Sequence, residues 1–213
     1  MIPIAIGSNY LHGVKQFLET ICIQDGIPQH LSWHQRRVDA TMQCFFPTHR
    51  HTWQLDECIT VPENCQSGKV KCRILYDAHH FGLHYSGYDL KSPSSLKLVH
   101  ISSAEDYRYK YADRSLLTEL FEQREDADDV LIIKEDWVTD TSIANIAFIK
   151  NGSWYTPSIP LLAGTTWKRL ISERILIPRP INQLEIQTFE GFKIFNAMVS
   201  FEASEVSPIG NIR

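Results

Sequence analysis

The sequence lacks both a surplus of positive charge and any long hydrophobic run, and each absence excludes a class of protein. Its 213 residues carry 21 Lys and Arg against 25 Asp and Glu. A chain without excess cations has little to hold a phosphate backbone, so nucleic acid is not expected as a partner. Apolar stretches such as Ile159–Ala163 fall far short of the roughly 20 residues that cross a bilayer. Because the apolar start at Ile2–Ile6 also lacks the basic residues of a secretion signal, we expect a soluble cytoplasmic protein with no membrane partner.

Cysteine is present in an odd, scattered set without a C-x-x-C pair, which argues against a metal knuckle or a redox motif. Reduced thiols fit a cytoplasm. Histidines cluster at His49–His51 and at His79–His80, where Asp77 could equally be a turn residue. Neither cluster has the H-E-x-x-H spacing of a zinc site, so we expect no metal. The five cysteines are Cys22, Cys44, Cys58, Cys65 and Cys72.

The first half of the chain has the pattern of a small sheet with one helix. Phe17–Gln24 reads as a strand that closes on Asp25–Gly26, a strong hairpin signal. A helix is expected from about Trp33 to Phe45, with Ser32 as its N-cap. Further strands are expected at Val70–Tyr76, which is apolar enough to pack on both faces, and at Leu96–Ile101.

The second half combines helices with short antiparallel strands. After Asp113, a candidate N-cap, the residues Leu116, Leu117, Leu120 and Phe121 recur at helical spacing and predict an amphipathic helix. Another helix is expected over Trp167–Ile175. Short strands are expected at Val130–Lys134, Trp137–Thr139, Ile146–Lys150 and Trp154–Thr156, with a turn at Asn151–Gly152. The pattern predicts an α+β fold with a small N-terminal α/β domain over residues 1–105 and a larger mixed domain over 106–213.

Lys110 is the first residue that could carry chemistry, because it lies between tyrosines in Tyr107–Tyr111. An isolated lysine is usually a solvated surface charge. Partial burial among aromatic rings and near Arg114 would instead favour the free amine, which attacks carbonyl groups and forms an imine.

Three other features have both a structural and a chemical reading. Asp140 at a strand end could cap an Asx turn or act as an acid. The segment Gly164–Thr166 could simply cap a helix or could bind a phosphate at the helix N-terminus. Arg37 could be a surface charge or a guanidinium that binds phosphate. Together with an imine-forming lysine, these are the parts that hold pyridoxal 5'-phosphate (PLP).

In this order along the chain, the motifs resemble those of the class IV aminotransferases, the PLP enzymes of fold type IV that include D-amino acid aminotransferase and aminodeoxychorismate lyase. Leu18–Gly26 is similar to the F-E-T-I-R-V-x-D-G strand and turn, and His34–Val38 to the H-x-x-R-L helix. Lys110–Arg114 is similar to the K-x-x-N-R of the lyase branch. The remaining matches are Asp126–Val130, Asp140–Ile146, Tyr155–Pro157, Gly164–Thr166 and Asn196–Met198.

The resemblance implies a role for each matched residue. Lys110 would form the Schiff base with PLP and move protons, while Asp140 would pair with the pyridine nitrogen. Arg37, Thr165 and Thr166 would hold the phosphate. Asn145 would support the strand that follows Asp140.

Several departures from the family pattern bear on substrate recognition. Asp140 replaces the usual Glu, Cys22 and Trp167 stand where Arg is common, and Ser115 stands where branched-chain enzymes have Tyr. The strand that precedes F-E-T-I in the family has no clear match in Met1–Gln16.

The motifs favour one reaction while leaving two alternatives open. The Lys110–Arg114 spacing, and Ala144 in place of a second Glu, favour a lyase that eliminates pyruvate from 4-amino-4-deoxychorismate and leaves 4-aminobenzoate for folate synthesis. The alternatives are an aminotransferase that acts between an amino acid and a 2-oxo acid, and a PLP-binding protein without turnover.

The resemblance also implies partners. It predicts a small-molecule substrate and a homodimer, in which the part from about Phe17 to Ser102 helps to wall the substrate site. Arg73 and Arg114 are the candidates for contact with the substrate, although a strand arginine such as Arg73 is more often part of a surface ion pair.

Overall fold

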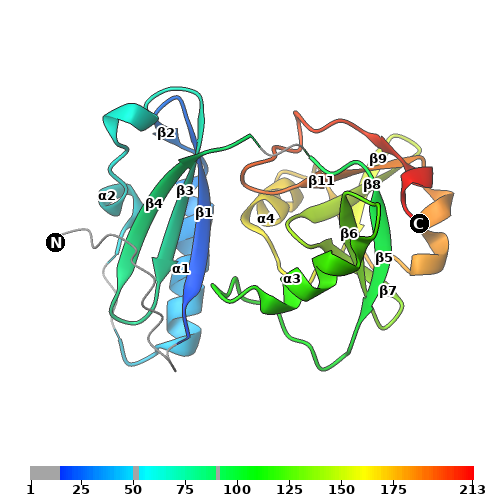
Figure 1. Cartoon of the computed structure of the whole chain (residues 1–213), viewed down its shortest axis with the longest axis horizontal. Coiled ribbons are helices and arrows are strands. Elements are labelled where there is room, and N and C mark those ends of the chain that lie inside the picture. Colours follow the sequence, from blue (N-terminus) through cyan, green and yellow to red (C-terminus); the bar gives the residue numbers. More distant parts are fainter. Residues whose placement is uncertain (1–14, 50–52, 90–91) are drawn as a thin grey trace. The chain divides into compact units, whose positions relative to one another are not determined.

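The computed structural model describes residues 15–49, 53–89 and 92–213, which form two compact units (Figure 1). Among these residues, the first unit contains 15–49, 53–89 and Tyr109–Asp113, and the second contains 92–108 and Arg114–Arg213. The second unit thus already includes residues 92–105, which the sequence-based division assigned to the N-terminal domain. The cause is the strand Leu96–Ile101, which pairs in parallel with Asp129–Lys134 of the second unit. The predictions made for residues 1–14 and for His51 lie outside the described residues.

The first unit is a four-stranded antiparallel sheet in the order β2-β1-β3-β4, with α1 and α2 packed on one face. Apolar residues at alternate positions of β1, such as Phe17 and Ile21, meet Val38 and Met42 of α1 in the core of this unit. The elements are β1 (Phe17–Gln24), β2 (Ile27–Pro28), α1 (Leu31–Phe45), α2 (Leu55–Cys58), the 3-10 turn η1 (Glu63–Cys65), β3 (Lys69–Tyr76) and β4 (Phe81–Gly87).

The predicted hairpin after β1 is confirmed. Asp25 and Gly26 have φ angles of 48° and 78°, and Gln24 pairs with Ile27 across the turn. Two successive residues with positive φ make a turn whose twist matches that of the strands, which is why Asp-Gly is favoured there.

The prediction that β3 packs on both faces is wrong. Buried and accessible residues alternate along it, so that Cys72 and Ile74 lie in the core while Lys69 and Arg73 are exposed. The sequence alternates in the same way, because Lys71 and Arg73 interrupt the apolar run, and a strand places successive side chains on opposite faces.

Two predicted helix starts also need correction. α1 begins at Leu31, so Ser32 lies within its first turn; His30, with φ 54°, is the N-cap and accepts the bond from Trp33 N–H with its carbonyl. The helix α3 (Ser115–Phe121) has Arg114 rather than Asp113 at its N-cap. In both helices backbone geometry determines the start, and neither cap makes a side-chain hydrogen bond.

The second unit contains a five-stranded sheet in the order β10-β9-β8-β11-β12 and a three-stranded sheet in the order β5-β6-β7. A shared apolar core contains Leu131, Ile146 and Phe192. The strands are β5 (Leu96–Ile101), β6 (Asp129–Lys134), β7 (Trp137–Thr141), β8 (Asn145–Lys150), β9 (Ser153–Pro157), β10 (Ile177–Arg179), β11 (Gly191–Phe195) and β12 (Ser207–Pro208). The helices are α3, α4 (Thr165–Ser172) and the 3-10 turns η2 (Glu122–Arg124), η3 (Gln183–Thr188) and η4 (Ile209–Asn211).

The helix α4 ends at Ser172, three residues before the predicted end. Arg174 takes a left-handed conformation with φ 59°, and its N–H donates to the carbonyl of Ile171. The N–H of Ile175 then donates to the carbonyl of Leu170. These two bonds form a Schellman motif, which closes a helix even without glycine.

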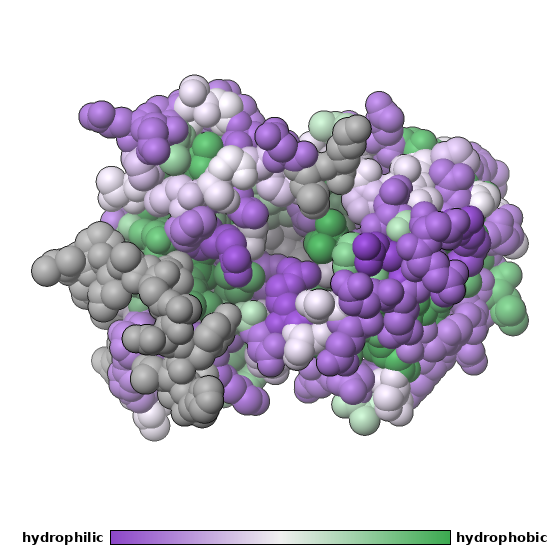
Figure 2. All heavy atoms as spheres, in the orientation of Figure 1, coloured by the Kyte–Doolittle hydropathy of each residue, from purple (hydrophilic) through white to green (hydrophobic). Residues whose placement is uncertain are grey.

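Hydrophilic residues cover most of the face of the second unit seen in Figure 2, with apolar residues scattered among them. Within the described ranges, no helix is both long and apolar enough to cross a membrane. All five cysteines are free thiols.

Candidate active site

Asp140 is a carboxyl group buried inside the second unit, on β7. Its Oδ2 accepts a 2.7 Å hydrogen bond from the N–H of Leu162, and its Oδ1 accepts one of 2.7 Å from the side-chain amide of Asn145. Burial raises the pKa of Asp140 to about 7, although these hydrogen bonds act in the opposite direction. No lysine or arginine in the described ranges forms an ion pair with it, so the site holds an acid without a cationic counterpart.

Asn145 joins Asp140 to the segment that leads into α4. It is the first residue of β8, and the turn that connects β7 to β8 brings it close to Asp140. Its Nδ2 also donates to the carbonyl of Leu162 at 2.9 Å, while its Oδ1 lies against Gly164. A single amide therefore connects the acid to the residues just before the helix.

The predicted phosphate turn forms the start of α4. Gly164 is the N-cap, and Thr165 and Thr166 are the first two helical residues, both buried. Backbone N–H groups at a helix start have no partner within the helix and suit an anion. Trp167, which replaces the family's usual Arg, donates from its indole to Thr156 Oγ1 at 3.1 Å and packs on the core. Its role is to attach α4 to β9.

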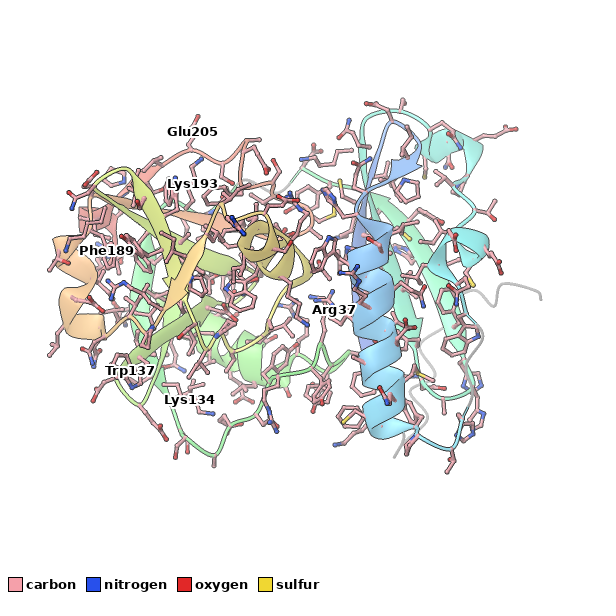
Figure 3. All side chains as sticks on the ribbon, turned by 180° about the vertical axis from the view of Figure 1, so that it is seen from behind. Arg37, Lys134, Trp137, Phe189, Lys193 and Glu205 are labelled. Carbon is pink, nitrogen blue, oxygen red and sulfur yellow. The ribbon has the colours of Figure 1, made fainter. Side chains whose placement is uncertain are left out.

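Arg37 lies on α1 in the first unit (Figure 3) and pairs with Glu19 of β1. Its Nε and Nη2 each donate a 2.6 Å bond to the carboxylate, and His34 Nδ1 lies 2.6 Å from Oε2 of the same group. Burial alone would raise the pKa of Glu19, but the charge of Arg37 and the bonds from both partners hold that pKa at about 2. The pKa of His34 is lowered by burial and, to a smaller extent, by the positive charges of Arg37 and Lys110, against the pull of Glu19.

Lys110 lies in the segment Tyr109–Asp113, which belongs to the first unit and runs antiparallel to the start of β1. Its carbonyl accepts a 2.9 Å bond from Leu18 N–H, and Tyr111 pairs with Phe17. The rings of Tyr109 and Tyr111 pack against the core of the unit. Lys110 is half-buried, so the predicted aromatic setting is present on both sides of it.

The two predicted substrate arginines lie in different surroundings. Arg73 is exposed on the face of the first sheet opposite α1, where it is flanked across the strands by Thr20 and His84. Arg114 is half-buried in the second unit and donates from Nη2 to the carbonyl of Ser142 at 2.9 Å. It therefore holds the β7–β8 turn next to Asp140, and its contact with a substrate stays a prediction.

The predicted residues are divided between the units. Lys110, Arg37 and Arg73 belong to the first, while Arg114, Asp140, Thr165 and Thr166 belong to the second. Within the second unit the structure brings Asp140 to the turn that begins α4. Within the first it places Arg37 and Lys110 in the electrostatic neighbourhood of His34.

Glu19 and His34 were not predicted as functional residues from the sequence. A signal for Glu19 was present: a carboxylate between Leu18 and Ile21, in a strand predicted to be apolar, must find a cationic partner when it is buried. For His34 the signal was its place as the first residue of the H-x-x-R-L motif, three positions before Arg37.

Comparisons with known proteins show the family of the chain. The sequence pattern of amino-transferase class IV matches residues 16–209, and the chain belongs to this family of enzymes. It is 36% identical over 181 residues, which are 84% of this chain and 96% of the relative, to an uncharacterized protein of Haemophilus influenzae.

Solved structures support the fold. A candidate 4-amino-4-deoxychorismate lyase from Haemophilus somnus is 31% identical and has a TM-score of 0.83, with 88% of this chain and 98% of that chain covered. A hypothetical aminotransferase from Mycobacterium tuberculosis, solved in a PLP-bound form, is 13% identical with a TM-score of 0.74, covering 96% of this chain and 86% of that one. These similarities confirm the predicted mixed α/β fold and the predicted family.

Proposed function

We propose that this protein is a PLP-dependent lyase that eliminates pyruvate from 4-amino-4-deoxychorismate and releases 4-aminobenzoate. The observation that supports PLP as the cofactor is that Asp140 is buried without a cationic partner in the part of the chain that the structure describes. An uncompensated carboxylate is costly in a protein interior, and a protonated ring nitrogen would supply the missing positive charge. The residues present therefore fit the cofactor.

The chain's own residues would hold the cofactor at three points. Asp140 would accept a hydrogen bond from the protonated ring nitrogen, and the N–H groups of Thr165 and Thr166 would bind the phosphate. Arg37 would add a donor at the phosphate, since Glu19 fixes its guanidinium through Nε and Nη2 and leaves Nη1 outside that pair. The Nζ of Lys110 would be the point of attachment.

Bound PLP supplies a ring that withdraws electrons from a substrate carbon. Asp140 keeps a proton at the ring nitrogen, which sustains that withdrawal. Lys110, half-buried between Tyr109 and Tyr111, would move protons at Nζ.

The face of the first sheet opposite α1 supports a substrate that carries carboxylates. Lys71 and Arg73 of β3 and His84 of β4 lie on this face, with Arg73 directly opposite His84. None of these three side chains forms an ion pair within the described residues. Lys71 and Arg73 are cations without an acidic partner among the described residues, so they attract anions, and 4-amino-4-deoxychorismate has two carboxylates.

The similarity to the candidate lyase from Haemophilus somnus favours elimination over amino transfer. The second candidate is an aminotransferase, which the family includes and which the fold allows equally. The two differ in what they consume, because a lyase acts on one substrate while a transaminase needs an oxo acid.

Product analysis separates the two functions. The purified protein loaded with PLP is incubated with 4-amino-4-deoxychorismate alone, and 4-aminobenzoate and pyruvate are measured together. The proposal expects equal amounts of both without any added oxo acid. A protein that forms neither product, but transfers an amino group from an amino acid to a 2-oxo acid, would be an aminotransferase.

A further inference from the structure

Asn145 contacts Asp140 in a way that only one orientation of its amide allows. Its Nδ2 lies 2.7 Å from a carboxyl oxygen of Asp140 and 2.9 Å from the carbonyl of Leu162. Both neighbours are acceptors, so the nitrogen and not the oxygen must point at them. The two protons of the amide are thereby both used, one on the acid and one on the backbone.

Asp140 and Asn145 both form hydrogen bonds with the backbone of Leu162. The N–H of Leu162 donates to Asp140 Oδ2, while its carbonyl accepts from Asn145. These bonds close a ring of contacts that contains the acid, the amide and the backbone of Leu162. A change in any member is therefore transmitted to the position of the carboxyl group.

The side-chain oxygen of Asn145 explains why position 164 is a glycine. A Cβ at position 164 would lie 2.3 Å from Asn145 Oδ1 and 3.4 Å from its Cγ. The φ and ψ of Gly164 are −62° and 155°, a conformation open to any residue. Glycine is needed here because the side chain of Asn145 occupies the space, and not because of the backbone.

We propose that Asn145 is a positioning residue for the cofactor-facing carboxyl of Asp140, and that position 164 lacks a side chain so that Asn145 can hold it. This inference rests on the proposed role of Asp140 and extends it to Asn145 and Gly164. It differs from a purely structural role for Asn145 in the strand, which would stabilise the fold without acting on Asp140.

The test follows the titration of Asp140 in the cofactor-free protein by carboxyl 13C NMR, so that it does not depend on activity. Asn145→Ala removes a hydrogen bond that favours the carboxylate, and the pKa of Asp140 rises by about 1 unit. Asn145→Asp keeps the shape of the side chain while placing a second carboxyl beside the first, and the rise is larger. Titration of Asp140 unchanged in both variants, whatever their stability, would overturn the proposal.

A double-mutant cycle tests the role of Gly164. Gly164→Ala displaces Asn145, so it raises the pKa of Asp140 and lowers the Tm in the wild-type background. In the Asn145→Ala background the obstructing oxygen is gone, and Gly164→Ala shifts both quantities by less than half as much. Additive effects would contradict the inference. Gly210→Ala is the matched control, because a Cβ there meets nothing within 4 Å.

The outcome can be separated from that of the proposed function. If the protein makes no 4-aminobenzoate but the pKa of Asp140 follows Asn145 and Gly164, the positioning holds and only the reaction is wrong. If the lyase is active but the pKa does not respond, the reaction stands and the positioning falls.

Discussion

Arg37 and Glu19 form a buried bidentate ion pair, with two donor–acceptor distances of 2.6 Å between α1 and β1. A buried pair of this kind contributes little net stability compared with apolar residues, but the loss of one partner is costly. Arg37 is therefore oriented by a buried carboxylate that His34 also contacts. This makes Glu19 a support of the proposed phosphate site.

Glu19→Gln should destabilise the protein by about 3–5 kcal/mol, because it leaves the guanidinium of Arg37 buried without a counter-charge. Chemical denaturation at neutral pH measures the loss. Glu205→Gln, at an exposed residue, is the control and should change stability by less than about 0.5 kcal/mol. Equal stabilities for the two variants would show that the buried pair is not formed.

We expect the Glu19 carboxylate to make the stability of the folded protein sensitive to acid. The pKa of Glu19 is about 2 in the folded protein and 4.5 as its ordinary value, so its contribution is present above pH 4.5 and is lost as the pH falls toward 2. Such a shift corresponds to about 3 kcal/mol. Stability measured between pH 2 and pH 5 should fall less steeply in Glu19→Gln than in the wild type.

We expect Asp140 to have the opposite effect on the pH dependence of stability in the cofactor-free protein. Its pKa is raised from 3.8 to about 7 by burial, so the folded state keeps a proton that the unfolded state has released. Stability should therefore fall by about 4 kcal/mol as the pH rises from about 4 to 7. In Asp140→Asn this loss should disappear, which pH-dependent unfolding of the two proteins would reveal; parallel curves would contradict the burial of the acid.

Catalysis should depend on the same residue. Asp140→Asn keeps the size of the side chain but cannot hold the ring nitrogen protonated, so turnover should fall by orders of magnitude while cofactor content stays largely unchanged. Absorbance spectra measure the content and product formation measures the rate. Unchanged turnover would assign the task to another group. The family usually has Glu at this position, which is one methylene longer than Asp. Asp140→Glu therefore tests whether the longer side chain restores or crowds the contact with the ring nitrogen.

We expect the holo-protein to be a homodimer, as the family resemblance implies. Sedimentation at micromolar concentration should give about twice the chain mass. A fully active monomer would remove this expectation.

Much of the fold follows from local signals. β1 with its Asp25–Gly26 turn, β5, and the strands around Asn151–Gly152 lie where hydrophobic alternation and turn residues predict them. Helix ends were less predictable, because His30 and Arg174 adopt left-handed conformations that the sequence does not signal for these residue types.

The candidate site shows a similar limit. The family motifs point to Lys110, Arg37 and Asp140 as candidate site residues. They do not reveal which side chains contact these three residues and hold them in place. Glu19 is 18 positions from Arg37, and Gly164 is 19 positions from Asn145. Contacts between residues so far apart in the sequence depend on how whole helices and strands pack, which local sequence patterns do not encode.

Attachment of the cofactor to Lys110 is the central claim, and one measurement tests it directly. The protein loaded with PLP is treated with borohydride, digested, and its peptides are mapped by mass. Lys110→Ala and Lys150→Ala, a half-buried lysine of β8 that donates to Thr188, are treated in parallel. The account predicts that the cofactor is trapped on the peptide that contains Lys110 in the wild type and in Lys150→Ala, and that Lys110→Ala traps none and is inactive. Cofactor trapped on another lysine, or retained in reducible form by Lys110→Ala, would contradict it.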